Sequence, residues 1–203
     1  HTSGLTYSFL PSPVAGMYGE NGVDAGLSRD PTEVNPMFIQ QSNTKPANLK
    51  EWSESLAELP LVCQPGTAWN YSVGMDVLGR LIEVISGMTF GEFLEKRIFA
   101  PLGMEDTGFY VPEEKVNRFA ANYFPNEEGT MNLMDDPTKS NYGAVPDIES
   151  GGGGLVGTVG DYFKFAQMLA NKGEYEGKRY LGKKTAEFMM SNHLTPGFPD
   201  DPL

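Results

Sequence analysis

Cysteine, histidine and basic residues are scarce in this chain of 203 residues. One cysteine, Cys63, excludes an internal disulfide, and with only two histidines there is no set of Cys and His ligands at metal-binding spacing. The 15 basic residues against 27 acidic ones give a formal charge of -12, which argues against the basic face that nucleic-acid binding requires. The sequence therefore predicts no metal site and no nucleic-acid partner.

Long apolar runs are also missing from the chain. No run approaches the roughly 18 residues of a membrane span, and none has the pattern of a signal peptide. With 39% hydrophobic residues the chain can bury a sizeable core, so a globular, soluble protein is expected. The sequence assigns no compartment.

The most informative stretch is residues 65–87, PGTAWNYSVGMDVLGRLIEVISG. A turn at Pro65-Gly66 leads into an extended segment with Tyr71, and from Val73 onward the pattern predicts an amphipathic helix that ends at Gly87. The predicted inward face consists of Val73, Val77, Leu78, Leu81, Ile82 and Ile85, and the polar residues that fall elsewhere are Asp76, Arg80 and Glu83. A rigid, buried helix is thus predicted to hold Tyr71 and Ser72.

Two more helices are predicted beside it. Residues 48–59 form the first, with Asn48 as its cap and Pro60 as its end, and residues 90–100 the second, capped by Thr89 and stopped by Pro101. The three helices are expected to pack as a unit.

Further along, a hairpin is expected around residues 126–129, and Thr158 or Asp161 is expected to cap a helix that ends at residues 171–173. The predicted core face of that helix is Tyr162, Phe165, Ala166, Met168 and Leu169. A turn or short hairpin then leads to a helix over residues 185–191.

Glycines at positions 151–154 form a run before the helix that Thr158 or Asp161 is expected to cap. Such a run can bind an anion through its backbone N–H groups, or it can allow close approach of a neighbouring element. Neither the dinucleotide nor the phosphate-loop pattern is met, which favours close approach. The acidic pairs Glu127-Glu128 and Asp135-Asp136 are interpreted as solvated loop charge.

A nucleophile is hard to find in the chain. The SxxK match Ser42-Asn43-Thr44-Lys45 precedes Pro46 and lacks an apolar helical face, so it is interpreted as accidental, and no GxSxG elbow is present. Tyr71 remains as a candidate acid or base.

Four segments resemble the serine β-lactamase and penicillin-binding-protein superfamily, in its class C β-lactamase branch and especially its family VIII carboxylesterases. Residues 65–87 resemble the second catalytic motif, and the other three segments are HTSGL at 1–5, PLGMEDT at 101–107 and SGGGGL at 150–155. The resemblance implies an α+β, β-lactamase/transpeptidase-like fold. Residues 1–203 would be its central, mostly helical part, because the SxxK segment and the C-terminal strand motifs are not found.

The resemblance also implies acyl transfer through a serine ester, with no cofactor. Tyr71 corresponds to the tyrosine that shuttles the proton, and Ser72 and Val73 to the substrate-binding positions after it. The family motif usually reads Tyr-x-Asn, and Val73 can neither donate nor accept, which favours an ester over a β-lactam or peptide.

Several alternatives stay open at this point. The substrate could be an ester or a β-lactam, and a class C-type β-lactamase, a D-Ala-D-Ala peptidase and a non-catalytic peptide-binding homologue remain candidates. A free-standing helical interaction module is a further one. Self-association through exposed apolar surface is also expected, since surfaces that should pack on the missing sheet would face solvent.

Overall fold

The computed structural model describes residues 6–7, 46–57, 73–126 and 129–192, and all structural statements below concern these residues. The helices are α3 (Leu49–Ala57), α4 (Gly74–Ser86), α5 (Phe90–Leu94), α6 (Ala100–Leu102), α7 (Val159–Ala170) and α8 (Lys183–Met189). A π-helical segment, η1 (Glu95–Phe99), joins α5 to α6, and two 3₁₀ helices are η2 (Glu113–Arg118) and η3 (Asn141–Gly143).

The strands form three antiparallel pairs. β1 (Thr6–Tyr7) pairs with β4 (Val156–Gly157), β2 (Asn122–Pro125) with β3 (Met131–Asp135), and β5 (Glu174–Tyr175) with β6 (Lys178–Arg179). Helices with a few short strands agree with the predicted α+β class. The hairpin expected around residue 126 is confirmed as β2–β3, and the turn before the last helix as β5–β6.

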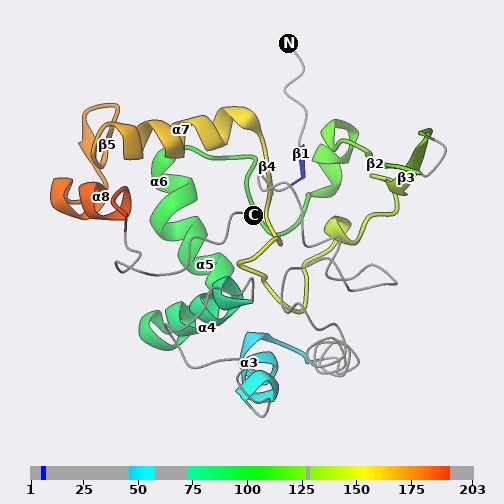
Figure 1. The fold of residues 1–203 in the computed structure, drawn as a ribbon, viewed down its shortest axis with the longest axis horizontal. Helices are drawn as coiled ribbons and strands as arrows, with labels where there is room; N and C mark the ends of the chain where they lie inside the picture. The colour runs from blue at the N-terminus through cyan, green and yellow to red at the C-terminus, as the bar shows by residue number, and fades with distance from the viewer. Residues whose placement is uncertain (1–5, 8–45, 58–72, 127–128, 193–203) are drawn as a thin grey trace.

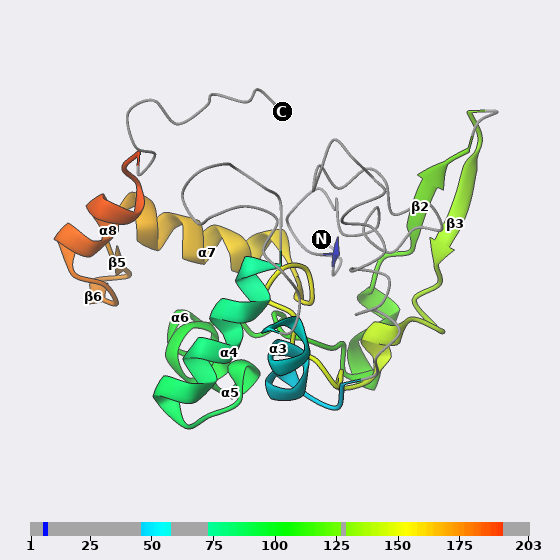
Figure 2. The same cartoon turned by 60° about the horizontal axis from the view of Figure 1, so that its bottom comes forward.

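Figure 1 shows how these elements are arranged. α7 runs along one edge with α8 at its end, α3 and α4 lie together on the opposite side, and the β2–β3 hairpin stands at the far end from α8. Figure 2 shows the same hairpin projecting away from the helices. Among the described helices, none has the length and apolarity to cross a membrane.

Most of the predicted helix ends are confirmed by their hydrogen bonds. The Asn48 side chain accepts from the Glu51 N–H at 2.9 Å, and Thr158 Oγ1 accepts from the Asp161 N–H at 3.1 Å. Thr89 forms a complete capping box with Glu92. Gly87 ends α4 with φ of 70°, a left-handed conformation that glycine adopts without strain.

The predicted stop at Pro101 is wrong. The helix continues to Leu102 and ends at Gly103, which has φ of 67°. In the π-helical segment the Ala100 N–H reaches the Glu95 carbonyl, five residues back. Pro101 then lies in the first turn of α6, where its missing N–H costs no hydrogen bond.

The main core lies where the helices meet. Its buried members are Leu49, Phe90, Leu94, Phe99, Leu102, Met104, Phe109 and Met168, with Trp52 and Ile82 packed against them. α4 contacts both α3 and α5, which confirms that the three helices pack as a unit. In α7, Met168, Phe165 and Leu169 join this core as predicted, whereas Tyr162 and Ala166 are exposed.

The predicted burial of α4 is wrong. Asp76 is only 7% exposed while Ile85 is 76% exposed, so much of the expected inward face lies in solvent. Gly79 explains this orientation, because a Cβ there would lie 3.0 Å from the Phe90 ring of α5, so a side chain would hold the helices apart. Glu83 accepts a hydrogen bond from the Phe90 N–H at 3.3 Å, which keeps the polar side of α4 against α5.

Within the first 45 residues the structure describes only Thr6–Tyr7, which form β1 against β4, a pairing that the sequence analysis did not predict. The last helix, expected over residues 185–191, is α8 and lies two residues earlier at each end.

Candidate functional site

Of the three predicted site residues, only Val73 belongs to the part of the chain that the structure describes. Tyr71 and Ser72, like the Ser42–Lys45 segment, lie outside the described residues. Val73 is described: it is half-buried, occupies the N-cap position of α4, and makes no capping hydrogen bond with its side chain. The start of α4 is therefore the part of the predicted site that the structure places.

The glycine segment, defined here as Ser150–Gly154, lies directly against this start. A Cβ on Gly151 would be 2.5 Å from the carbonyl oxygen of Met75, and a Cβ on Gly152 would be 3.0 Å from Oδ2 of Asp76. The contact at Gly151 is with the backbone itself, so a side chain there would force the two backbones apart, whereas a side chain at Gly152 would press on the carboxylate of Asp76. Close backbone approach, the interpretation that the sequence favoured, is thus confirmed for this segment.

Hydrogen bonds from other elements hold the glycine segment in place. Next to it, Glu149 Oε2 accepts from the Gly91 N–H at 2.7 Å, near the start of α5. The hydroxyl of Tyr142 donates to the Gly153 carbonyl at 3.1 Å, and burial raises the pKa of this phenol, with a smaller contribution from Asp135. Because Tyr142 stays protonated near neutral pH, it remains a donor and an anchor.

The segment PLGMEDT at 101–107 has a structural role. Oδ2 of Asp161, in the first turn of α7, accepts from the Asp106 N–H at 2.8 Å and from the Thr107 hydroxyl at 3.0 Å. Asp106 in turn pairs with Arg118 at 2.6 Å and Lys115 at 2.8 Å.

Of the acidic pair Asp135-Asp136, Asp135 accepts a hydrogen bond from the Ser140 hydroxyl at 2.7 Å, so its carboxylate has a local structural contact.

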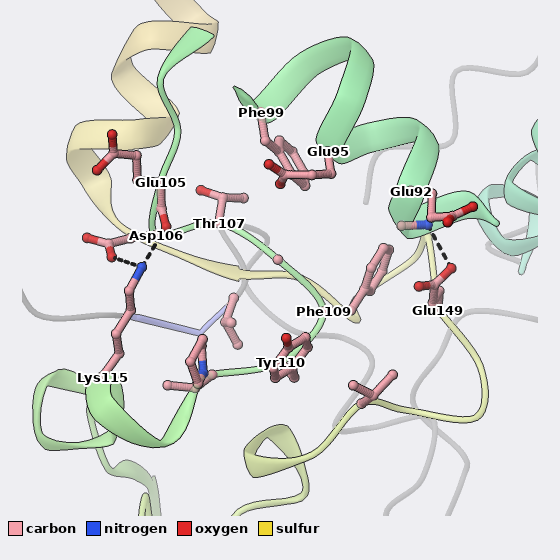
Figure 3. Close-up of a pocket in the computed structure, with 16 residues that line it drawn as sticks. Glu92, Glu95, Phe99, Glu105, Asp106, Thr107, Phe109, Tyr110, Lys115 and Glu149 are labelled. Atoms are coloured by element: carbon pink, nitrogen blue, oxygen red, sulfur yellow. Dashed lines mark hydrogen bonds and ion pairs between the residues drawn. The ribbon is translucent and has the colours of Figure 1, made fainter. Parts of the chain in front are cut away.

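A cavity of about 380 Å³ opens between α5–η1 and the chain that follows α6. Figure 3 shows Glu92, Glu95 and Phe99 on one side, and Phe109 and Tyr110 on the other. Two of its carboxylates, Asp106 and Glu149, are already bound to Lys115 and to the Gly91 N–H. None of residues 73–76 lines this cavity, so it is separate from the start of α4.

No metal centre is seen in the part of the chain that the structure describes, where no three Cys, His, Asp or Glu side chains gather at ligand distance. Lys184 and Thr185 lie in the first turn of α8.

Sequence reasoning missed three residues around the glycine segment: Asp76, Tyr142 and Glu149. The sequence analysis placed Asp76 among the polar residues outside the predicted inward face of α4, and yet it is buried. One signal was available, because Asp76 is the third residue of a helix without a capping side chain at Val73, a position where a carboxylate usually has a role. Nothing in the sequence indicated Tyr142.

Comparison with known proteins agrees with the resemblance described above. A sequence profile described as Beta-lactamase matches residues 1–202. Protein Rv1367c of Mycobacterium tuberculosis is 33% identical over 198 residues, which cover 96% of this chain and 43% of that protein. The lovastatin esterase of Penicillium rubens is 29% identical, with 97% and 43% covered.

Solved structures give the same answer for the fold. EstCE1, a hydrolase with promiscuous acyltransferase activity, superposes with a TM-score of 0.56 and 25% identity, over 93% of this chain and 48% of that one. The chain thus spans less than half the length of the relatives it matches. A profile match over nearly the whole chain, together with the shared β-lactamase/transpeptidase-like fold, shows that this chain belongs to the Beta-lactamase family.

Proposed function

We propose that the whole protein is a serine hydrolase that cleaves carboxylic esters through an acyl-enzyme, and that residues 1–203 form the central part of its catalytic domain. One observation carries the proposal: the motif Tyr71-Ser72-Val73 directly precedes α4 in the sequence, and the glycine segment lies against the first turn of that helix. The similarity to a lovastatin esterase and to the hydrolase EstCE1 supports ester chemistry.

In the proposed reaction a serine oxygen attacks the ester carbonyl and gives up its proton to Tyr71, assisted by a lysine. The tetrahedral intermediate collapses, the alcohol leaves with that proton, and water then hydrolyses the acyl-enzyme to the acid and free serine. A tyrosine with an ordinary pKa of about 10 needs a neighbouring ammonium group to act as a base near neutral pH. We propose that this serine and lysine are not Ser42 and Lys45, because Pro46 follows and interrupts the required helix.

Val73 supports an ester in preference to a β-lactam. Its side chain has no polar atom, and it stands where the resembling motif has an asparagine that holds the substrate amide. An ester has no N–H group to be left without a partner, so its binding loses little from this replacement.

The test is a comparison of Tyr71→Phe with the unchanged whole protein, using p-nitrophenyl butyrate and a chromogenic cephalosporin. The expected loss of kcat/KM for the ester is at least ~100-fold, because removing a general base usually costs that much. Tyr123→Phe is the matched control, since this tyrosine lies exposed in β2 and should leave the rate unchanged.

Full ester activity in Tyr71→Phe would remove Tyr71 from the mechanism. Hydrolysis of the cephalosporin but not of the ester would reverse the proposed substrate preference.

We also propose that residues 1–203 self-associate through the exposed apolar side of α4. The side chains concerned are Val77, Leu78, Leu81, Val84 and Ile85. A row of apolar groups in water favours association with a second such row. Sedimentation of the chain should show oligomers, and Ile85→Glu should shift them toward the monomer. A monomer at all concentrations would contradict this part of the proposal.

A further inference from the structure

The start of α5 binds side chains from two other segments of the chain. The first N–H groups of a helix have no partner within it, so they find acceptors elsewhere. Glu83 Oε1 of α4 accepts from the Phe90 N–H at 3.3 Å. The N–H of Gly91 donates to Glu149 Oε2 at 2.7 Å, across 58 positions of sequence (Figure 3). The same helix end therefore contacts both α4 and the residue that precedes the glycine segment.

The carboxylate of Glu149 lies directly against Gly91. A Cβ on this glycine would collide with Oε1, while Oε2 accepts from the N–H, so no side chain fits there. Gly160 is the second residue of α7, as Gly91 is of α5, and there the nearest atom to a Cβ is Thr158 Oγ1 at 3.8 Å. Because glycine weakens a helix relative to alanine, its presence at position 91 needs a reason, and the carboxylate of Glu149 supplies one.

The glycine segment has few side chains with which to hold its own position. The N–H of Gly154 donates to the Ser150 carbonyl at 3.0 Å, which closes the segment into a turn. Two side chains tie this turn to other elements: the Tyr142 hydroxyl, which donates to the Gly153 carbonyl, and the Glu149 carboxylate. A hydrogen bond to a charged acceptor is stronger than one between neutral groups, so Glu149 makes the firmer of these two contacts.

We propose that Glu149 is a positioning residue, whose carboxylate binds the start of α5 and thereby sets how far the glycine segment stands from the start of α4. Gly151 of this segment packs against the carbonyl of Met75, two residues after the motif position Val73, so the segment forms one wall of the proposed substrate-binding space. That consequence rests on the proposed ester hydrolysis, whereas the contact itself can be tested without it.

The first experiment measures steady-state hydrolysis of p-nitrophenyl butyrate by the whole protein. Glu149→Ala should raise KM roughly 5- to 10-fold and change kcat by less than about twofold, because a displaced wall weakens substrate binding. A purely structural loss would instead lower kcat, through a smaller folded fraction, and leave KM as it was. Glu149→Gln, whose amide oxygen can still accept from the Gly91 N–H, should recover most of the loss. Glu114→Ala, which removes an exposed glutamate of η2, is the control and should leave KM unchanged.

A double-mutant cycle tests whether Glu149 acts through Gly91. Gly91→Ala puts a methyl group where Oε1 lies, and the flexible side chain of Glu149 can turn away, so the variant should lose the hydrogen bond but keep the fold. It should raise KM as much as Glu149→Ala does, and the double variant should show no further rise. Gly160→Ala adds the same methyl group in α7 without a close neighbour, so it should leave KM unchanged.

Hydrogen exchange measures the contact independently of any activity, and NMR of protein that carries isotope-labelled glycine resolves the amides concerned. Glu149→Ala should speed exchange of the Gly91 amide at least ~10-fold, because this N–H has no acceptor within its own helix. The Gly154 amide should also exchange faster, since its turn is no longer tied to α5. The Gly108 amide, which donates to the Val156 carbonyl at 3.0 Å, is the internal reference and should not change.

Any of four results would overturn the proposal: unchanged exchange at Gly91 in Glu149→Ala, unchanged KM in that variant, no recovery in Glu149→Gln, or additive effects of Glu149→Ala and Gly91→Ala. Should Glu149→Ala not fold, Gly91→Ala decides the same points, because it breaks the contact without leaving a cavity. If the unchanged protein hydrolyses no ester, the proposed function fails, and exchange at Gly91 and Gly154 still decides whether Glu149 positions the segment.

Discussion

The ion cluster around Asp106 allows a quantitative prediction for the variant Asp106→Asn. The carboxylate accepts from both terminal nitrogens of Arg118, at 3.1 and 2.6 Å, and pairs with Lys115 at 2.8 Å. These contacts, with the Arg118 hydrogen bond as the largest cause, lower the pKa of Asp106 from its ordinary 3.8 to about 2. A bidentate guanidinium contact of this kind is the strongest form of side-chain ion pair.

The magnitude follows from linkage between protonation and folding. A lowering of nearly two pKa units corresponds to at most about 2.5 kcal/mol of stability. The side chains of Asp106, Lys115 and Arg118 are 20%, 28% and 32% exposed, so solvent screens part of this energy. We therefore expect Asp106→Asn to lower the free energy of unfolding by about 1 to 1.5 kcal/mol at pH 7.

The direction of the pH dependence is fixed by the sign of the shift. The folded protein binds the proton of Asp106 more weakly than the unfolded chain does, so the stabilisation is complete above about pH 4 and is lost as the pH falls toward 2. Urea unfolding of the whole protein and of its Asp106→Asn variant at pH 7, 5, 4 and 3 measures the difference in their free energies of unfolding.

The difference should be constant from pH 7 to 5 and smaller at pH 3. Asp147→Asn, an exposed carboxylate, is the control and should show no such trend. A difference that stays the same down to pH 3, or that grows there, would refute the reasoning.

Two further predictions concern the ends of helices. Val73→Asn restores an amide at the start of α4 and should raise kcat/KM for a chromogenic cephalosporin relative to p-nitrophenyl butyrate by roughly 2- to 10-fold, the worth of one hydrogen bond. An unchanged ratio would show that Val73 does not set the preference. Thr89→Ala removes half of the capping box with Glu92 and should lower the free energy of unfolding by about 1 kcal/mol, measured by urea unfolding. Stability equal to that of the unchanged protein would mean that the cap is not formed in solution.

Local structure was largely predictable from the sequence. The caps at Asn48, Thr89 and Thr158 and the left-handed end at Gly87 all follow from interactions within a few residues, so neighbouring side chains determine them. The same is true of the β2–β3 hairpin, whose turn at residues 126–129 lies between two short extended runs. The prediction that the helix ends at Pro101 was wrong, because the π-helical segment before it shifts the backbone hydrogen-bond pattern by one residue.

The orientation of α4 was not predictable in this way. The period of its apolar residues indicates which residues share a face, but it does not say which face another part of the protein covers. Contact with Phe90 at Gly79 and with the glycine segment at Gly151 decided that Asp76 is buried and Ile85 exposed. These partners are between 11 and 76 positions away in the sequence, beyond the reach of any local pattern.

By itself, the sequence determined the family and the motif, because Tyr71-Ser72-Val73 and the three other segments are recognised from the order of residues alone. Only the tertiary structure decided what packs against the helix that follows it. It placed the glycine segment against the start of α4, and it buried Asp76 between them. The physical reason is that burial and close approach depend on contacts between distant segments, which form only when the whole chain has packed.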